Sequence, residues 1–196
     1  MKFSTEHLNV LCNSQFLLTK QKLLEYIYEQ LSHWQSWHLS YVKVYEQYTA
    51  GVFRKPLSGK ISRGENYRGL PYLVLDAPRF FTPEDVFAIR IMFWWGNDFS
   101  YTLHLAGKPL EMYRASLKKK LVELAENEVF FCVNPSPWEY HFEEDNYQKL
   151  AAAPTEMIEA HLFQKNFVKL SRKLPITDFE KFNDFVEESF SLFLID

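Results

Sequence analysis

Apolar residues recur every three or four positions in three long stretches of the chain, and this period predicts amphipathic helices. The first stretch should form a helix from about Thr19 to about Trp37. The second follows Gly107, and the third opens at Thr177 with a Thr-x-x-Glu capping box. The inward positions are Leu24, Ile27, Leu31 and Trp34 in the first helix, Leu110, Tyr113, Leu117, Leu121 and Leu124 in the second, and Phe179, Phe182, Val186, Phe190 and Phe193 in the third.

Runs of β-branched and aromatic residues between turn signals predict strands. Tyr72–Ala77 should form a buried strand that Pro78 closes, because proline has no N–H group to donate to a sheet. The glycine-rich stretch Gly51–Gly69 predicts a loop with at most a short strand at Lys60–Arg63. Further short elements are strands at Val129–Val133, Trp138–Phe142 and Phe167–Leu174, and helices at Glu144–Ala151 and from Thr155. The partly alternating stretch Tyr41–Tyr48 fits a strand or a helix, and we favour a helix that continues after a break.

The most informative strand signal is a hairpin at about residues 87–106. Thr82-Pro-Glu-Asp85 is typical of a helix start, but the alternating residues after it favour a strand, so one helical turn is expected before the strand. A three-residue loop, Gly96–Asp98, places the apolar positions of both strands on one face, whereas a two-residue loop would set apolar positions against polar ones. The other face then holds Arg90 roughly opposite His104.

The fold class that these elements predict is α+β. Helices are expected at both ends and in the middle of the chain, without the strict alternation of strand and helix that a doubly wound parallel sheet requires. We expect an antiparallel sheet with a central aromatic-rich hairpin (about 87–106) packed by amphipathic helices. A length of 196 residues favours a single domain over residues 1–196.

The composition is that of a globular protein with many aromatic rings. Phe, Tyr and Trp make up 17% of the residues, which predicts a ring-rich core, with a stacking surface for a flat ligand as the alternative. The net charge of −3 gives no attraction to nucleic acid or to an anionic membrane, and no stretch approaches the ~20 apolar residues of a membrane span. Two cysteines far apart, Cys12 and Cys132, suit a reducing compartment, so a cytoplasmic location is expected.

Several motifs that carry chemistry are absent from the sequence. It contains no GxGxxG, GxxxxGK[ST], GxSxG, HExxH or paired CxxC motif, so no nucleotide cofactor and no metal site is expected. The spacing His141-x-Glu143 is half of a zinc-deaminase motif, but no Pro-Cys-x-x-Cys follows, and we interpret it as chance. The six histidines never fall at i and i+4.

The densest polar cluster lies between Lys60 and Arg79. Arginines in a glycine-punctuated loop suit a phosphate or carboxylate, because a guanidinium group donates two parallel hydrogen bonds. The alternative is that Arg63 and Arg68 form ion pairs with the acidic stretch Glu139, Glu143, Glu144 and Asp145.

If this loop folds over the polar face of the hairpin, the two together form a concave site for a small anionic or planar ligand. The candidate ligand-binding residues are Arg63, Glu65, Tyr67, Arg68, Arg79, Arg90, Trp94 and His104. The leading functional hypothesis is therefore a cytoplasmic small-ligand-binding domain.

Two other functions remain open. In a metal-independent enzyme, His104 would be the general acid or base, oriented by Glu65 or Asp76, although a histidine on a strand is more often structural. In an interaction protein, exposed rings such as Trp94 or Trp138 would form a homodimer or partner interface. Trp94 and Trp95 must point to opposite faces of a strand, so one of them is expected in a groove or an interface.

The segment Lys60–Gly107, with its runs KISRGENYRGLPYLVLDAPR and MFWWGNDFSYTLHLAGK, resembles a family of small bacterial proteins classed as a domain of unknown function. The resemblance covers about a quarter of the chain. It implies no activity, substrate or catalytic residue.

Overall fold

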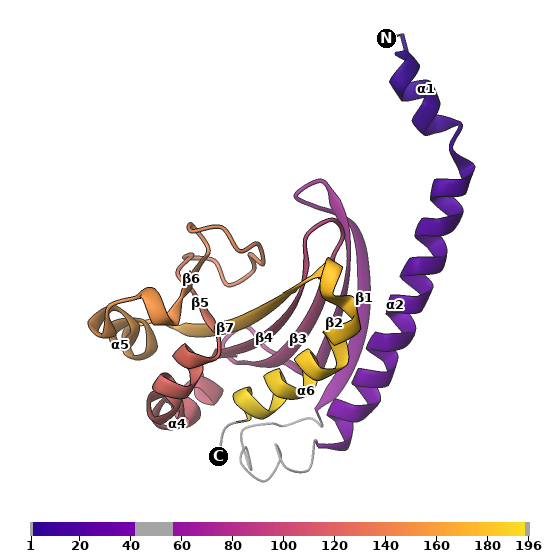
Figure 1. The fold of residues 1–196 in the computed structure, drawn as a ribbon. Coiled ribbons are helices and arrows are strands. Elements are labelled where there is room, and N and C mark those ends of the chain that lie inside the picture. The colour runs from indigo at the N-terminus through magenta and orange to yellow at the C-terminus, as the bar shows by residue number, and fades with distance from the viewer. Residues whose placement is uncertain (1, 42–56, 195–196) are drawn as a thin grey trace.

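The computed structural model, which describes residues 2–41 and 57–194, is built on one curved antiparallel sheet (Figure 1). Its seven strands lie in the order β1-β2-β3-β4-β7-β5-β6. The strands are β1 (Ser58–Tyr67), β2 (Leu70–Phe81), β3 (Val86–Trp94), β4 (Asp98–Ala106), β5 (Phe130–Cys132), β6 (Tyr147–Lys149) and β7 (Phe167–Pro175). The described helices are α1 (Thr5–Leu11), α2 (Ser14–Ser40), α4 (Lys108–Glu126), α5 (Thr155–Gln164) and α6 (Phe182–Phe193), with 3-10 helices η1 (Leu150–Ala152) and η2 (Ile176–Lys181). The expected α+β class is confirmed, and the expected hairpin is the β3–β4 pair near the middle of the sheet.

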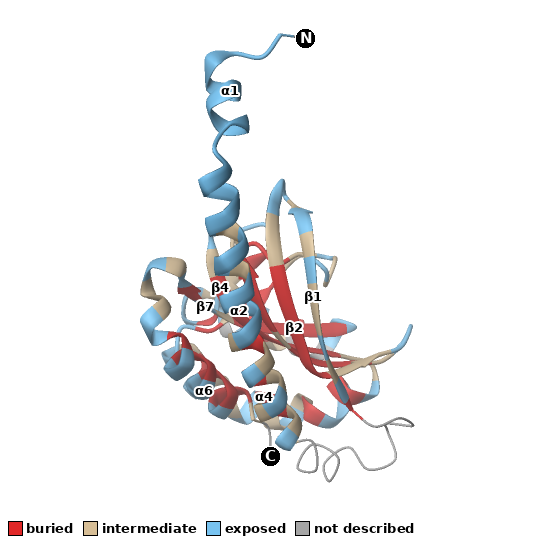
Figure 2. Cartoon of the chain, turned by 90° about the vertical axis from the view of Figure 1, so that its right-hand side faces the viewer, coloured by how far each residue is buried: buried red, intermediate tan, exposed pale blue. Residues whose placement is uncertain are grey.

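One face of the sheet, which we call the inner face, carries the main core. Alternate residues of β3 and β4 point to it, and helices α2, α4 and α6 cover it (Figure 1). Coloured by burial, the central strands are red where these helices lie over them, whereas α1 and the upper part of α2 are pale blue (Figure 2). We call the opposite side of the sheet the outer face. No helix of the described ranges is both long enough and apolar enough to cross a bilayer.

Helix α2 is longer than predicted at its N-terminal end. It begins at Ser14 because the side chain of Asn13 accepts a hydrogen bond from the N–H of Phe16 (3.0 Å) and caps the helix. Upstream, Ser4 and His7 form a capping box for α1, a helix that the apolar period did not predict. Residues 42–48 of the predicted helix at Tyr41–Tyr48 lie outside the described residues, as do residues 51–56 of the predicted loop.

Two proline-containing segments differ from the prediction. Strand β2 continues through Pro78 to Phe81, because Pro78 falls in a register shift of the pairing with β3, where a missing N–H is tolerated. Thr82–Asp85 is a turn between β2 and β3 rather than a helical turn. The Thr82 hydroxyl accepts a hydrogen bond from the N–H of Asp85 (2.8 Å), and the N–H of Thr82 donates to the carbonyl of Asp85 (2.9 Å). The Thr82 side chain, which was expected to cap a helix, therefore closes the β2–β3 hairpin.

Three predictions in the C-terminal half were wrong. Trp138–Phe142 is irregular rather than a strand, and Glu144–Ala151 contains β6 and part of η1 rather than a helix. The last α-helix begins at Phe182, after η2, because Asp178 has a non-helical conformation (φ −102°, ψ 28°). The Thr177 hydroxyl donates to the Asp178 carboxylate instead of capping the helix. The predicted inward residues of this helix nevertheless pack in the core.

Candidate functional site

The alternation predicted for the β3–β4 hairpin is confirmed. Ile91 and Phe93 belong to the main core, whereas Met92 and Trp94 belong to a separate cluster on the outer face. The register differs from the prediction, because the three-residue loop is Trp95–Asn97 and Asp98 already opens β4. The pairing of β3 with β4 is thus shifted by two positions. Because this number is even, each side chain stays on the face of the sheet predicted for it.

The shift separates the two polar residues expected to face each other. Arg90 pairs with Thr102 on β4, and His104 pairs with Ala88 on β3. Both side chains still lie on the outer face, and the neighbouring strand β7 adds Lys169 directly beside His104.

A segment of the same chain covers the outer face. Residues Val133–Asn146, which we call the cover segment, connect β5 to β6 and lie over β4 and β7. Lys169 is fully buried beneath it, and its Nζ donates hydrogen bonds to the carbonyls of Pro137 (2.9 Å) and Glu139. The space that we predicted for a ligand is therefore filled by the protein itself.

Arg90 is committed to an ion pair with Asp76 on β2. The guanidinium group donates from Nε to Oδ1 (2.7 Å) and from the Nη2 atom to Oδ2 (2.8 Å), the two-pronged geometry of a strong pair. Its carbon Cζ lies 4.6 Å from the centre of the Tyr140 ring in the cover segment. Asp76 is 6% exposed. Asp76 thus engages the Nε and Nη2 donors of a side chain that is only 17% exposed.

His104 is buried at 3% exposure, with its ring against Trp138 at 5.5 Å between centroids. Its Nε2 atom has no hydrogen-bond partner among the described residues. Burial lowers the pKa of His104 to about 3, and the charges of Lys169 and Arg90 act in the same direction. The imidazole is consequently neutral at pH 7 and shielded from water.

The carboxylates expected to orient His104 are engaged elsewhere. Asp76 accepts hydrogen bonds from Arg90, and Glu65 accepts one from Lys20 (3.0 Å). A general base needs a partner and access to substrate. The geometry favours the structural alternative for His104.

Tyr67 and Trp94 do come together, as a structural anchor for the cover segment. Their rings lie 5.1 Å apart, and the Trp94 indole N–H donates to the Tyr67 carbonyl (3.2 Å). The Tyr67 hydroxyl accepts hydrogen bonds from the backbone N–H groups of Tyr140 (2.7 Å) and His141 (3.1 Å) and donates to Glu139 (2.9 Å). These contacts explain why the segment is not a strand: its N–H groups bond to a side chain.

The predicted arginine loop is instead the β1–β2 hairpin, and its arginines do not converge. Arg63 is exposed and pairs with Glu65 (3.6 Å) on its own strand, and Arg79 packs over the ring of Phe81. Arg68, in the turn at φ 49°, pairs with Glu143 (2.8 Å). The ion-pair alternative is thus confirmed for Arg68, whereas Arg63 has a different partner.

Arg63 and Glu65 line a cavity of about 580 Å³ between α2 and β1. Its other charged lining residues are Lys20, Glu25 and Glu29, so acidic groups outnumber basic ones. Both basic side chains are already within ion-pair distance of Glu65. This cavity does not suit an anionic ligand.

One group of side chains has the composition of a metal site. The ligand atoms of His141, Glu143 and Asp145 lie within 4.8 Å of one another. Within the group, His141 Nε2 lies 3.0 Å from Asp145 Oδ1, and the Arg68 guanidinium pairs with Glu143. These residues could contact a cation, but Arg68 already supplies positive charge there.

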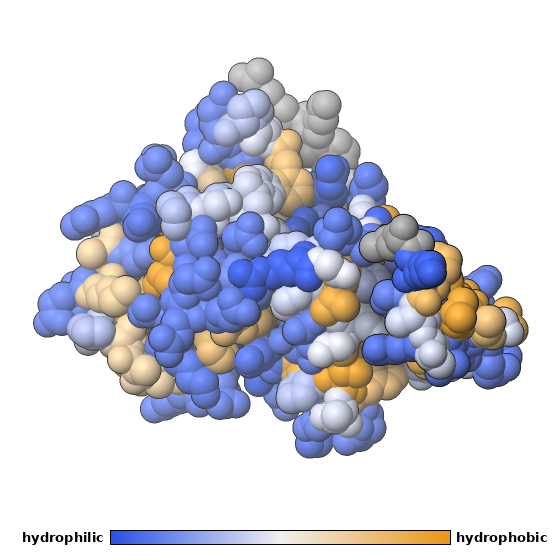
Figure 3. Space-filling model, turned by 90° about the horizontal axis from the view of Figure 1, so that it is seen from above, coloured by the Kyte–Doolittle hydropathy of each residue, from blue (hydrophilic) through white to orange (hydrophobic). Residues whose placement is uncertain are grey.

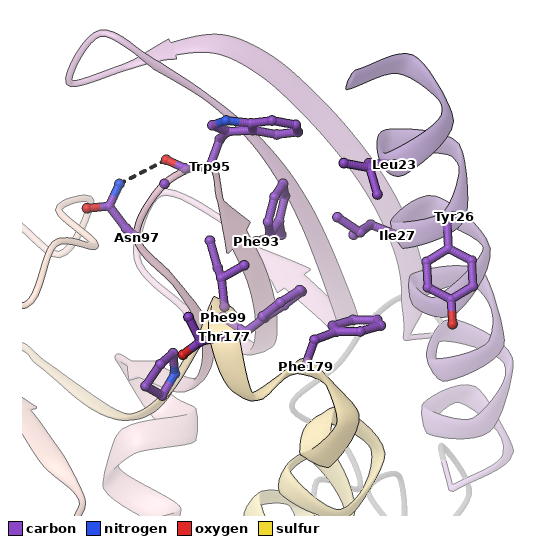
Figure 4. Close-up of a pocket in the computed structure, with 12 residues that line it drawn as sticks. Leu23, Tyr26, Ile27, Phe93, Trp95, Asn97, Phe99, Thr177 and Phe179 are labelled. Carbon is purple, nitrogen blue, oxygen red and sulfur yellow. Dashed lines mark hydrogen bonds between the residues drawn. The ribbon is translucent and has the colours of Figure 1, made fainter. Parts of the chain in front are cut away.

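An apolar cavity lies at the tip of the β3–β4 hairpin, on the inner face. It has a volume of about 550 Å³ and opens between α2, the hairpin loop and η2 (Figure 4). We call it the tip groove. Its lining residues are Leu23, Tyr26, Ile27, Phe93, Trp95, Gly96, Asn97, Phe99, Pro175, Ile176, Thr177 and Phe179.

Aromatic rings form the wall of the tip groove. Phe93 lies 5.8 Å from Trp95 and 5.1 Å from Phe99, and Phe179 lies 5.4 Å from Phe99 and 5.7 Å from Tyr26, all between ring centroids. Figure 4 shows these side chains directed into the space between the hairpin and α2. Polar atoms are few: the Asn97 amide, which donates to the carbonyl of Trp95 (3.0 Å), and the hydroxyls of Tyr26 and Thr177.

Sequence reasoning did not identify the tip groove. Of the adjacent pair expected to place one ring in a groove or an interface, Trp94 was named as the exposed ring, but Trp94 is buried in the outer-face cluster and Trp95 lines the groove. The contribution of Phe179 depends on η2, where a regular helix was expected. The hairpin, α2 and η2 are far apart in sequence, so no local pattern could place them around one space.

Comparison of the chain with protein-family models, with curated proteins and with solved structures gives no match.

Proposed function

We propose that this protein is a small-molecule-binding domain that holds a planar, uncharged ligand in the tip groove. The volume of about 550 Å³ falls in the range of roughly 300–1,000 Å³ that is typical of ligand sites. Such sites are mainly apolar and aromatic with a few polar atoms that fix orientation, and the tip groove has this composition. Its lining includes no Lys or Arg, which favours the planar alternative of the sequence analysis over the anionic one.

The observation that carries the proposal is the ring wall formed by Phe93, Trp95, Phe99 and Phe179. Trp95 is only partly buried although its indole packs against Phe93, so a bound ring could contact it without unfolding the core. Aromatic pairs contribute roughly 0.5–1.5 kcal/mol beyond the area that they bury. The Asn97 amide and the Thr177 hydroxyl would orient a polar end of the ligand.

Titration with Nile red, an uncharged planar dye, tests the proposal. We expect saturable binding, followed by dye fluorescence and by a rise in the unfolding temperature of the protein. Trp95→Ala should weaken binding by about tenfold, which corresponds to roughly 1.4 kcal/mol. Trp138→Ala is the matched control, because Trp138 is 52% exposed on the outer face, away from the groove.

Unaltered dye affinity in Trp95→Ala, or an equal loss in Trp138→Ala, would contradict a site in the tip groove. Folding of each variant is checked by its urea unfolding midpoint, so that weaker binding is not confused with loss of structure.

We also propose a reducing, cytoplasmic setting. Cys12 is exposed, and Cys132 is buried in a cluster with Tyr147 and Phe167. Both are free. Two free thiols fit a compartment in which disulfides do not form. The net charge of −3 likewise supports a partner other than nucleic acid.

A further inference from the structure

The N-terminal end of the molecule presents a long apolar surface that is exposed in the described structure, and one of its residues, Leu17, also lines the cavity between α2 and β1. Residues 2–19 are all exposed, and α1 with the first turns of α2 projects beyond the sheet (Figures 1 and 2). We call residues 3–18 the arm. Seven large apolar side chains of the arm are 48–66% exposed: Phe3, Leu8, Val10, Leu11, Phe16, Leu17 and Leu18. Seen from above, hydrophobic atoms gather at the right of the view, where Figure 1 places α1 and α2 (Figure 3).

The part of the arm that is least stable by itself is α1, because the rest belongs to the first turns of the 27-residue helix α2. Isolated helices shorter than about 12–15 residues are marginal in water, and α1 has 7 residues. The first ion pair that ties α2 to the sheet is Lys20–Glu65, beyond the end of the arm. The consecutive residues Phe16, Leu17 and Leu18 point to different sides of α2, and a helix that is apolar on several sides is normally buried. A partner surface is therefore required.

The charge pattern favours a protein surface over a lipid one. Helices that lie on membranes carry Lys and Arg on the polar face, which attract anionic headgroups. The arm contains no Lys or Arg, and Glu6 is its one acidic residue.

We propose that the arm pairs with the arm of a second copy of this chain, antiparallel and about a two-fold axis near Asn13. In this arrangement Leu11 of one copy reaches the level of Phe16 of the other, and Val10 reaches the level of Leu17. Glu6 of each copy comes to the level of residues 20–22 of the other, beside the exposed ammonium of Lys22. The surface is thus complementary to itself in both apolar residues and charge, which an isologous dimer requires.

The area of the arm matches that of a stable dimer. If each of the seven side chains exposes roughly 100 Å² of apolar surface, pairing hides on the order of 700 Å² per copy. A standard interface buries about 800 Å² per partner. The pairing is distinct from ligand binding in the tip groove and does not rest on it.

Sedimentation equilibrium at micromolar concentration tests the proposal with the full chain. The wild-type protein should have twice the chain mass of 23.4 kDa. Leu11→Glu combined with Leu17→Glu should raise the dissociation constant at least tenfold and give a folded monomer, with the urea midpoint that the wild type shows when diluted below its own dissociation constant. Val122→Glu is the matched control, because Val122 is 71% exposed on α4 and lies outside the arm. It should leave the dimer intact.

A charge exchange tests the antiparallel arrangement. Glu6→Lys and Lys22→Glu should each weaken the dimer by several-fold, because each places like charges opposite one another. The two substitutions in one chain should restore it. Failure of the double variant to recover would overturn the antiparallel register.

Two results would overturn dimerisation itself. One is a wild-type chain that remains a monomer throughout the micromolar range. The other is a monomer that binds vesicles of neutral phosphatidylcholine and loses this binding in the Leu11→Glu, Leu17→Glu variant, which would assign the arm to a lipid surface.

Discussion

The ammonium group of Lys169 lies 4.1 Å from the centre of the Tyr140 ring, although Lys169 is fully buried. Burial lowers the pKa of this lysine to about 8, so the group is still mainly charged at pH 7. The ring face and two backbone carbonyls of the cover segment stabilise that charge. The Lys169 cation on β7 therefore helps to hold the cover segment on the outer face, together with the hydrogen bonds of the Tyr67 hydroxyl.

Lys169→Met should destabilise the protein by about 3 kcal/mol. The carbonyls of Pro137 and Glu139 lose their donor, and each unsatisfied buried group costs roughly 1–3 kcal/mol. Amide hydrogen exchange should accelerate in residues 138–142 before global unfolding. Lys173→Met should cost less than about 1 kcal/mol, because Lys173 is exposed on the same strand and its ammonium touches the cover segment only at the ring of Phe142 (5.1 Å). Equal protection of the cover segment in both variants would refute this role of Lys169.

Asp76→Leu should cost about 3–5 kcal/mol, because it leaves the Arg90 charge buried without its partner. Adding Arg90→Leu should recover most of that loss, since an apolar pair removes both desolvation costs. Urea unfolding of the two single variants and the double variant gives the coupling energy. The exposed pair Arg63–Glu65 supplies the comparison, with an expected coupling below about 1 kcal/mol. A coupling for Asp76 and Arg90 as small as this would show that the buried Arg90 charge does not depend on Asp76.

The sequence predicted the faces of the central hairpin and of the three long helices, because burial imposes its period on the residues themselves. The two sides of β3 were assigned correctly from alternation alone. A shift by an even number of positions leaves that alternation unchanged, so the pattern could not distinguish the two loops that would place Arg90 opposite Thr102 or opposite His104.

What covers the outer face could not be predicted, because its contacts are long-range. The Tyr67 hydroxyl bonds to the backbone of Tyr140 and His141, and Lys169 bonds to the backbone of Pro137. Backbone acceptors and donors leave no signature in side-chain pattern. Arg90 and His104 do lie on the outer face, whereas Arg63 pairs with the core residue Leu73 and lies on the side of α2. The expectation of an open site assumed that nothing lay over the outer face.

Gly107→Ala should destabilise the protein more than Gly69→Ala. Both glycines have positive φ (61° and 85°), which costs an alanine roughly 1–2 kcal/mol. A Cβ at Gly69 would meet nothing within 4 Å, whereas one at Gly107 would clash with the Asp85 carboxylate and the Glu84 carbonyl. Asp85 Oδ1 also accepts the N–H of Lys108 (2.9 Å) at the start of α4. Equal thermal unfolding midpoints for the two variants would contradict this difference.

The stability of the protein should fall as the pH is lowered below 6.5. Burial lowers the pKa of His38 to about 4, of His104 to about 3 and of His161 to about 4. Between those values and 6.5, the unfolded chain binds protons at these sites and the folded chain does not, so acid favours unfolding. Asp98 acts in the opposite direction. Burial raises its pKa to about 6, so the folded chain binds this proton more tightly as the pH falls from 6 toward 3.8.

On acidification, the three histidines together lower the free energy of unfolding by more than Asp98 raises it, so the protein loses stability. Between pH 7 and about pH 5.5, His38 and His104 each remove roughly 1.2 kcal/mol, His161 adds to the loss, and Asp98 returns about 0.8 kcal/mol. Urea unfolding at the two pH values should therefore show a loss on the order of 2–3 kcal/mol. His104→Leu should reduce this loss by roughly 1 kcal/mol, because the imidazole no longer takes up a proton on unfolding. His33→Leu, at an exposed position on α2, should leave it unchanged. If the His104→Leu variant loses as much stability as the wild type, His104 does not remain neutral in the folded protein, and the closed outer face described here would have to be open to water.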